Sequence, residues 1–403
     1  MSQRPMMFRA RRILRGAIGA AALLVSAASL AGAQSNLSTQ GFGYPPGELS
    51  SRAIATGGAV AEIDPWSPVN PSSIAVFATK VLFFQIEPEY RTVTTSKGTD
   101  RTTTARYPVV FGAMPVGDRW VMSLGASTLL DRTSSTTFKS LQQFGSDTQT
   151  VTTKYDLNGA INDVRLAAAT TALSWLRLGV GAHAFTGRNL VTVAQAFRDT
   201  TSFAGFQLQR NLGFSGGAVS LGGQINAKYV VAAASVRHGG TMRMSADDTL
   251  LATAKVPDHY GVSLAYVGIK NSAIAIRASH ENWSAMNGFA SAEQAPLCGG
   301  GTCSAPPTFH GRDAWDVSVG ADMEGPRIGD YGVQLRAGYR NRTLPFDVGT
   351  HEVTERSITG GIGTLFAAGH VGVDLGVARA TRDASTTASE RAWMLSIGLT
   401  VRP

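Results

Sequence analysis

Residues 315–323 read WDVSVGADM, and apolar and polar side chains alternate at every position. Successive side chains of a β-strand point to opposite faces, so this period of two predicts a strand with one apolar and one polar face. Residues 120–130, 331–340 and 393–402 alternate in the same way. The polar faces carry mostly Gly, Ser, Asp, Gln, Arg and His. The pattern therefore indicates an antiparallel sheet whose two faces meet different surroundings.

The same alternation, followed along the whole chain, predicts an even number of strands. We expect fourteen, at residues 81–96, 102–115, 119–132, 149–173, 176–189, 207–225, 229–242, 252–267, 272–284, 312–323, 331–342, 352–366, 369–381 and 389–401. Most links after even-numbered strands are short, whereas the links at 133–148, 190–206, 243–251 and 285–311 are long and polar. Short turns at one end and long loops at the other are typical of bacterial outer-membrane barrels.

The apolar faces also favour a membrane setting. Beyond residue 33 the chain has no uninterrupted apolar run long enough for a spanning helix, and only helices and closed barrels satisfy every backbone group in lipid. Aromatic residues gather near strand ends, as interface girdles do. They are Trp120, Trp175, Tyr229, Tyr260, Trp283, Trp315, Tyr331, Tyr339 and Trp393. We interpret residues 81–403 as an all-β, 14-stranded antiparallel transmembrane β-barrel; a soluble β-sandwich or periplasmic barrel is the alternative.

Residues 1–33 have the pattern of a secretory signal peptide. Five Arg precede the apolar run at 16–30, and Ala31-Gly32-Ala33 predicts cleavage before Gln34. A membrane anchor is the alternative interpretation. Removal of the segment, with its five Arg and no acidic residue, lowers the formal net charge from +8 to +3. No basic patch interleaved with aromatic residues remains, so the sequence gives no sign of nucleic-acid binding.

Between the signal and the first strand, residues 52–73 read RAIATGGAVAEIDPWSPVNPSS. This stretch does not alternate. Gly and Pro dipeptides of this kind mark turns and breaks, because Gly permits positive φ and Pro removes a backbone donor. We expect residues 34–80 to fold back into the barrel as a hatch, with a short helix at residues 72–79.

Two cysteines, Cys298 and Cys303, lie in CGGGTC within the longest predicted loop. An exported chain meets an oxidising compartment, so a disulfide within this loop is expected. A free pair or a metal site is the alternative. No His or Cys partner stands at zinc-finger spacing, which leaves no further support for a metal, and no cofactor motif is present.

Catalytic signals are weak. Residues 213–217 match G-x-S-x-G, but that motif requires a strand, a sharp turn and a helix, whereas the residues that follow continue as a strand. His183 falls on a polar face and is interpreted as a lumen-lining residue. His280 and Glu281 are adjacent and point to opposite faces. No group of Ser, His and an acid can be assembled from the sequence, so we do not expect an enzyme.

Several motifs, in this order along nearly the whole mature chain, resemble those of the FadL-type hydrophobic-compound transporters of bacterial outer membranes. They are Arg52-Ala53, Gly57-Gly58-Ala59, Asp64 and Asn70-Pro71 in the opening segment; residues 222–228 and 231–237; Lys255-Val256-Pro257-Asp258, residues 261–266 and Asn282-Trp283-Ser284; and residues 335–340 with Leu344-Pro345-Phe346. Ser72 stands where the family has Ala after Asn-Pro, and the chain ends in Val401-Arg402-Pro403 instead of a terminal aromatic residue.

The resemblance implies a barrel plugged by its N-terminal hatch, which passes long-chain fatty acids or other hydrophobic compounds by passive diffusion. In this interpretation Arg52, Gly57, Gly58, Asp64, Asn70 and Pro71 belong to the hatch or gate. A carboxylate head group would need a cation, and the candidates on lumen-facing positions are Arg237, Arg277, Arg336 and Arg340. These arginines could equally pair with Asp316 and Asp322 within the lumen. The expected setting is a monomer in the outer membrane of a Gram-negative-type bacterium, in contact with its lipid.

Two other functions stay open. A barrel of the same superfamily could act as a docking or secretion-associated surface protein without transport. A general water-filled porin is the third possibility, although a Gly- and Pro-rich plug argues against it because a filled lumen conducts poorly.

Overall fold

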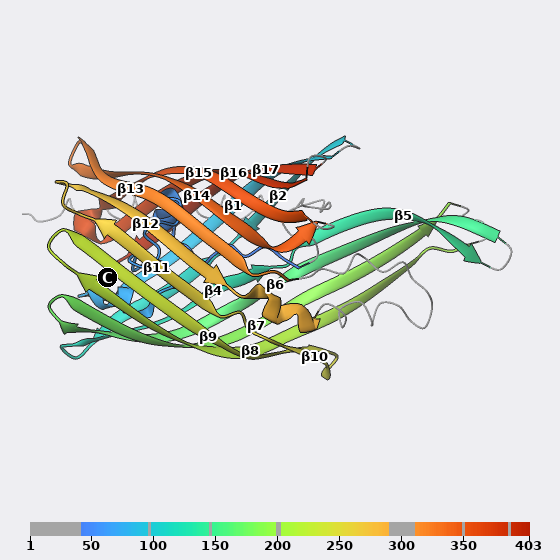
Figure 1. Cartoon of the computed structure of the whole chain (residues 1–403), viewed down its shortest axis with the longest axis horizontal. Coiled ribbons are helices and arrows are strands. Elements are labelled where there is room, and N and C mark those ends of the chain that lie inside the picture. Colours follow the sequence, from blue (N-terminus) through green and yellow to red (C-terminus); the bar gives the residue numbers. More distant parts are fainter. Residues whose placement is uncertain are drawn as a thin grey trace, which may run out of the picture.

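The computed structural model describes residues 42–95, 98–144, 147–198, 203–289, 311–348, 351–385 and 388–403. These parts of the chain form one antiparallel sheet, in which β1 (Val81–Thr95) pairs with β17 (Ala388–Val401) and so closes a barrel (Figure 1). The strands between them are β2 (Gly98–Arg106), β3 (Val109–Val116), β4 (Trp120–Asp131), β5 (Ser134–Phe144), β6 (Asp147–Leu173), β7 (Leu176–Phe197), β8 (Phe206–Asn226), β9 (Val230–Ala246), β10 (Thr249–Lys255), β11 (His259–Tyr266), β12 (Ser272–Glu281), β13 (Ala314–Ile328), β14 (Tyr331–Val348), β15 (His351–Phe366) and β16 (Val371–Ser385).

Three strands of the barrel are interrupted. β2 and β3 both pair with β1, β4 and β5 both pair with β6, and β10 and β11 both pair with β9. The first interruption falls at Tyr107 and Pro108, where proline has no N–H to donate to the ladder. Each pair is one wall strand, so the barrel has fourteen antiparallel strands. The predicted fold class and strand number are confirmed.

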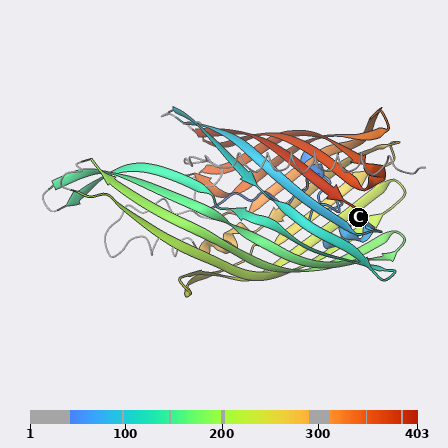
Figure 2. The same cartoon turned by 180° about the vertical axis from the view of Figure 1, so that it is seen from behind.

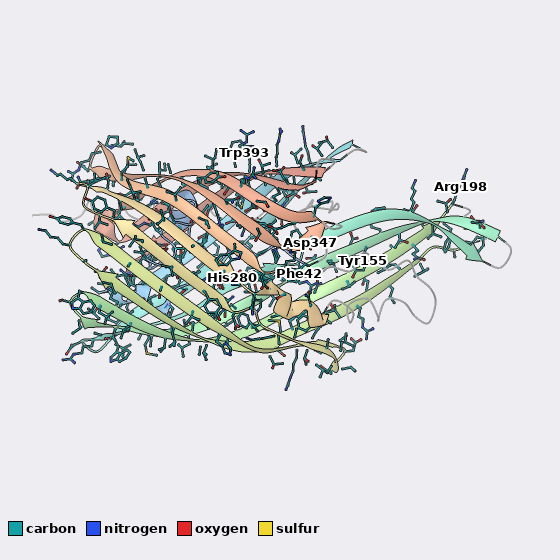
Figure 3. All side chains as sticks on the ribbon, viewed as in Figure 1. Phe42, Tyr155, Arg198, His280, Asp347 and Trp393 are labelled. Atoms are coloured by element: carbon teal, nitrogen blue, oxygen red, sulfur yellow. The ribbon has the colours of Figure 1, made fainter. Side chains whose placement is uncertain are left out.

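The wall has the alternation that the sequence predicts. On β11, buried and exposed residues alternate from His259 to Tyr266, and the exposed set faces outward. Trp120, Trp315 and Trp393 are about half exposed, and Figure 3 shows Trp393 on the outer surface. Trp283 is the exception in the predicted girdle, because it is 1% exposed and lies inside the barrel. Its place in η2 (Trp283–Phe289), a 3₁₀ helix beyond the end of β12, turns its ring inward.

Four strands extend well beyond the rest of the wall. β5, β6, β7 and β8 project from the end of the barrel opposite the C-terminus, and Figure 2 shows this extension from behind. Residues 133–148, 190–206 and 243–251 were expected as loops, but the structure continues as strands through much of all three. Their Thr, Val and Gln residues alternate and suit a pleated sheet, so the loop expectation was wrong there. We call the end with the projecting strands the long-strand end, and the opposite end the short-turn end.

The N-terminal segment (residues 42–80) contains two short helices. They are α2 (Ser51–Ala55) and the 3₁₀ helix η1 (Pro71–Val76). Ser50 caps α2 by accepting from the Ala53 N–H, and Asn70 caps η1 in the same way at Ser72. The helix expected at residues 72–79 corresponds to η1, whereas α2 was not expected. A last 3₁₀ turn, η4 (Ala367–Gly369), links β15 to β16.

Some predictions lie outside the described residues. The signal peptide at residues 1–33, the first residues of the expected hatch, and Cys298 and Cys303 with their predicted disulfide belong to these parts of the chain. Within the described ranges, no helix is long and apolar enough to cross a membrane.

Candidate functional site

A large group of buried apolar side chains lies in the lumen toward the long-strand end. We call this group the apolar lumen cluster. It includes Phe42, Leu129, Tyr155, Leu157, Ile161, Phe185, Val191, Val193, Phe214, Met242, Met244, Trp283, Met286, Phe289, Leu344 and Phe346. They come from many wall strands, from η2 and from the start of the N-terminal segment, so residues distant in the sequence converge there.

The cluster is formed by contacts between aromatic rings and by the inward-facing residues of the wall strands. The rings of Phe42 and Trp283 lie 5.7 Å apart, edge to face, and those of Phe214 and Phe289 lie 5.9 Å apart. Phe214 stands inside the G-x-S-x-G match, which is ordinary β8 strand: Phe214 points inward and Ser215 is exposed. Flexible Met side chains fill irregular apolar spaces well, and such a lining suits apolar ligands of varied shape.

The other half of the lumen is occupied by the N-terminal segment. Lumen-facing side chains from around the barrel bond to it. Gln85 on β1 and Thr359 on β15 donate to the carbonyls of Leu49 and Ala55, at 3.1 and 3.0 Å. The hydroxyls of Ser51 and Ser396, on β17, lie 2.9 Å apart. Ser127 on β4, Ser235 on β9 and Arg277 on β12 hold the segment from other sides of the barrel. Because most of its residues are also buried, the segment lies within the lumen.

Glycines in the wall allow this close approach. A Cβ at Gly320 or Gly338 would overlap the backbone of Thr56, and one at Gly179 would lie 2.5 Å from the Pro71 carbonyl carbon. Gly57 itself has φ of +67° and faces the Tyr339 backbone, so a side chain is excluded there twice over. The polar faces of the strands are therefore Gly-rich where they meet the segment.

The hatch residues singled out from the sequence hold the segment together and to the wall. Arg52 donates to Asp322 on β13 through Nε, at 3.0 Å, and lies 3.7 Å from Asp64. Asp64 accepts hydrogen bonds from the hydroxyls of Ser50 and Ser67. Asn70 donates to the Glu62 carbonyl at 2.7 Å, which ties η1 to the preceding turn. Gly58, with φ of +95°, continues the turn after Gly57.

Two of the four predicted ligand-binding arginines bind carboxylates of the N-terminal segment. Arg237 on β9 donates to Glu48 at 3.1 Å, and Ser127 donates to the same carboxylate at 2.7 Å. Arg277 on β12 donates to Glu62 at 3.1 Å. Both arginines are buried, so these are ion pairs within the lumen that join the segment to the wall.

The other two arginines bind carboxylates of the wall. Arg336 and Arg340, on β14, donate to Asp322 at 3.4 Å and to Asp316 at 2.6 Å. Arg336 also pairs with Asp374 on β16. All four candidate arginines thus have acidic partners. Arg277, Arg336 and Arg340 pair with Asp316 or Asp322, as the alternative interpretation of the sequence anticipated, whereas Arg237 pairs with Glu48.

Glu62 illustrates the electrostatics of these contacts. Burial alone raises the pKa of the Glu62 carboxyl. The His259 imidazole 3.6 Å away and the Arg277 guanidinium outweigh burial, and the pKa falls to about 2. Glu62 therefore stays charged at neutral pH and keeps its attraction for the wall.

Tyr44 lies at the centre of a charged group that the sequence analysis missed. Four guanidinium groups face its ring, with those of Arg106 and Arg382 4.6 Å from the ring centroid and Arg342 at 4.8 Å. The carboxylates of Glu87, Glu89, Asp131, Glu355 and Glu390 neutralise these cations. Charged residues at alternate positions 87, 89 and 91 on one face of β1 were the available signal.

A pocket of about 470 Å³ opens at the short-turn end. Arg52, Trp66, Arg336, Asp374 and Arg402 are among its lining residues. It lies on the far side of the N-terminal segment from the apolar lumen cluster, so the segment stands between that cluster and the charged pocket.

The structure also assembles a group that the sequence analysis did not find. Asp163, His183 and Ser220 lie on the adjacent strands β6, β7 and β8 and are joined by hydrogen bonds. The statement that no Ser, His and acid come together was wrong. Their contact depends on the register between strands, which one strand's sequence does not reveal.

Three solved structures show what this fold is similar to. A FadL homologue of Pseudomonas aeruginosa matches with a TM-score of 0.61 and 11% identity over 89% of this chain and 99% of that one. The CymD monoaromatic hydrocarbon channel matches with a TM-score of 0.55 and 14% identity, over 88% and 97%. The toluene transporter TbuX of Ralstonia pickettii matches with a TM-score of 0.54 and 14% identity, over 88% and 98%. No family model and no curated protein matches the sequence.

At these identities the likeness establishes the fold. The barrel shared with the FadL homologue and the two hydrocarbon channels confirms, at the level of fold, the resemblance that the sequence motifs indicated.

Proposed function

We propose that this chain, which has the fold of the FadL-type channels, passes hydrophobic compounds passively through the outer membrane. The observation that carries the proposal is the apolar lumen cluster beside a lumen filled by the N-terminal segment. An apolar solute crosses a polar leaflet slowly, and apolar side chains inside the barrel lower the free energy of its passage. After export directed by residues 1–33, the protein would act as a monomer surrounded by outer-membrane lipid.

Residues 34–80 would serve as the hatch. The ion pairs of Glu48 and Glu62 with Arg237 and Arg277 hold the described part of this segment against the wall. Its displacement would connect the apolar lumen cluster to the charged pocket at the short-turn end. We place that end in the periplasm, because short turns face the periplasm in outer-membrane barrels.

The ligand is a long-chain fatty acid or another hydrophobic compound. A fatty acid head group would have to compete with Glu48 for Arg237, since that cation is already paired. An uncharged hydrocarbon needs no such exchange and binds through apolar surface alone. The paired arginines therefore favour uncharged compounds.

A docking or secretion-associated role is the second candidate. The projecting part of β5–β8 favours it, because this sheet extends beyond the barrel and would stand outside the cell surface (Figure 1). A partner-binding barrel would lose its function when this extension is shortened, without any change in uptake.

Uptake by cells tests the proposal. A strain with the gene deleted is supplied with the unchanged gene, with Phe214→Ala, or with Val219→Ala, and uptake of radiolabelled oleate and of toluene is measured. Phe214 lies in the apolar lumen cluster, whereas Val219 faces outward on the same strand. We expect deletion and Phe214→Ala to reduce uptake and Val219→Ala to preserve it. Unchanged uptake of both compounds on deletion would contradict the proposal.

A further inference from the structure

Asp163, His183 and Ser220 form a continuous chain of hydrogen bonds across three strands. Asp163 Oδ2 lies 2.7 Å from His183 Nδ1, and His183 Nε2 lies 2.8 Å from Ser220 Oγ. All three residues face the lumen and are at most 8% exposed. The chain connects an acid, an imidazole and a hydroxyl in the order that activates a serine nucleophile.

Strand register and one glycine bring the groups together. Arg165 on β6 stands opposite His183 on β7, and Gly181 stands opposite Ser220 on β8. His183 therefore lies diagonally between Asp163 and Ser220. A Cβ at Gly181 would be 2.5 Å from Ser220 Oγ and 3.4 Å from His183 Nε2, so a side chain at this position would overlap the hydroxyl.

The hydrogen bonds assign the protons. An ionised Asp163 only accepts, so His183 Nδ1–H must donate to it. In the neutral imidazole, Nε2 then carries a lone pair and accepts from the Ser220 O–H. This is the tautomer in which His183 can remove the serine proton.

Two residues beside His183 and Ser220 would suit an apolar ester: an aromatic ring and a buried cation. The ring of Phe185, a member of the apolar lumen cluster, stacks on His183 with centroids 6.2 Å apart. Arg165 is 6% exposed, and among the described residues its NH1 has no hydrogen-bond partner. Its Cδ lies 3.8 Å from the position that a Cβ of Gly181 would take. A guanidinium with an unused donor beside a nucleophile can stabilise a developing oxyanion.

We propose that Ser220, His183 and Asp163 hydrolyse carboxylic esters with apolar chains inside the lumen. The inference rests on the proposed function in one respect, namely that apolar compounds enter the apolar lumen cluster. Ser220 and His183 would be catalytic residues and Asp163 a positioning residue. Arg165 would bind the carbonyl oxygen.

The reaction balances without a further cofactor. Ser220 Oγ bonds to the ester carbonyl carbon while its proton passes to His183 Nε2. The bond to the alcohol oxygen then breaks, and that oxygen takes the proton from His183. Water, activated by His183, attacks the acyl-serine, releases the carboxylic acid and returns the proton to Ser220.

A covalent probe tests the nucleophile. The purified full-length protein in detergent is treated with a fluorescent alkyl fluorophosphonate, and the modified residue is identified by peptide mass mapping. We expect the label on Ser220. Ser220→Ala and His183→Ala should lose it, whereas Ser263→Ala, which removes another buried lumen-facing serine hydroxyl, should keep it. An unmodified Ser220 in the unchanged protein overturns the proposal, and this result does not depend on whether a variant folds.

Ester hydrolysis tests the mechanism. Hydrolysis of p-nitrophenyl octanoate should fall at least about 100-fold in Ser220→Ala and His183→Ala, the usual contribution of acid–base catalysis. Asp163→Asn removes the carboxylate that orients His183 and should lower both the labelling rate and kcat while KM for the ester stays unchanged. Equal hydrolysis rates in the unchanged protein and the variants, or an Asp163→Asn variant whose KM changes while kcat does not, would overturn the assignment.

Uptake measured on the same variants separates the two proposals. Normal uptake without Ser220 labelling would overturn the hydrolytic site and leave the channel intact. Ser220 labelling and hydrolysis in a protein whose deletion changes no uptake would support the site and count against the channel.

Discussion

The two halves of the lumen are built from different interactions. Toward the long-strand end, aromatic rings and Met side chains pack into a large apolar cluster, which borders the charged group around Tyr44. Toward the short-turn end, glycines and ion pairs receive the N-terminal segment, as at Gly338 and Arg277. Apolar packing is non-directional and tolerates many occupants, whereas ion pairs and close backbone contacts specify one. The contrast suggests that the first half accepts ligands and the second half is closed by one fixed occupant.

The largest change should come from removing that occupant. Deletion of residues 34–80 should convert the protein from a closed barrel to one with a steady, large single-channel conductance in planar bilayers, because the segment fills the lumen. The intact protein in the same bilayer is the control. A steady large conductance of the intact protein would show that the segment does not seal the barrel.

A single methyl group should disturb the closed half. Gly338→Ala places a Cβ into the backbone of Thr56 and should displace the segment, which would appear as open bursts and faster proteolysis of residues 42–80. Gly332→Ala is the matched control on β14, since a Cβ there has no atom within 4 Å. Similar behaviour of the two variants would argue that the close contact at Gly338 has no role.

Loss of an ion pair should cost stability. Arg277→Ala leaves the buried Glu62 with only Ser235 and His259 as partners, and removal of one side of a buried ion pair typically lowers the free energy of unfolding by about 3–5 kcal/mol. Lys154→Ala breaks the exposed pair with Asp156 and should cost roughly 0–1 kcal/mol. Urea unfolding followed by tryptophan fluorescence measures both. Equal losses would mean that the lumen pair is no stronger than a surface pair.

A substitution in the apolar lumen cluster should change the affinity for the proposed ligand. Phe214→Ala removes an apolar ring from the cluster, and loss of about 1.5–3 kcal/mol of apolar contact would weaken toluene or oleate binding roughly 10- to 100-fold. Val219→Ala, on the outward face of β8, should leave the dissociation constant unchanged. Isothermal titration of the detergent-solubilised protein checks both variants. Unaltered affinity in Phe214→Ala would place the ligand elsewhere.

The smallest effect is expected from mild acid. The pKa of Glu62 is lowered to about 2, so its contribution to the closed state is present above its ordinary value of 4.5 and is lost only as the pH falls through about 2. Conductance should therefore stay low between pH 7 and pH 4. Opening near pH 4.5 in the intact protein, absent in Glu62→Gln, would show that Glu62 titrates normally.

Features that depend on one strand alone could be predicted from the sequence, and features that depend on several strands could not. Alternation within a strand is local, so it predicts which residues face the lumen and how many strands close the barrel. Contacts between strands depend on register, and that is why Asp163, His183 and Ser220 were not grouped. Trp283 was misplaced because it leaves the strand for η2, where the period of two no longer applies.

The extension of β5–β8 beyond the barrel was missed for a different reason. Length alone does not separate a polar strand from a polar loop, since a strand that leaves the membrane no longer needs an apolar face. Val191, Thr192 and Val193 on β7 are β-branched residues that favour strands, and they were the available sign that the strand continues. The buried group around Tyr44 likewise needed the N-terminal segment and the wall strands to be placed together.

A disulfide between the N-terminal segment and the wall tests the central claim most directly. Ser51 and Ser396 have hydroxyls 2.9 Å apart, so Ser51→Cys with Ser396→Cys, in a chain with Cys298→Ser and Cys303→Ser, should form the cross-link on oxidation. Uptake of toluene and oleate by cells is measured before oxidation, after oxidation and after reduction. If the segment is the gate, oxidation abolishes uptake and reduction restores it. Unchanged uptake through the cross-linked protein would contradict the account.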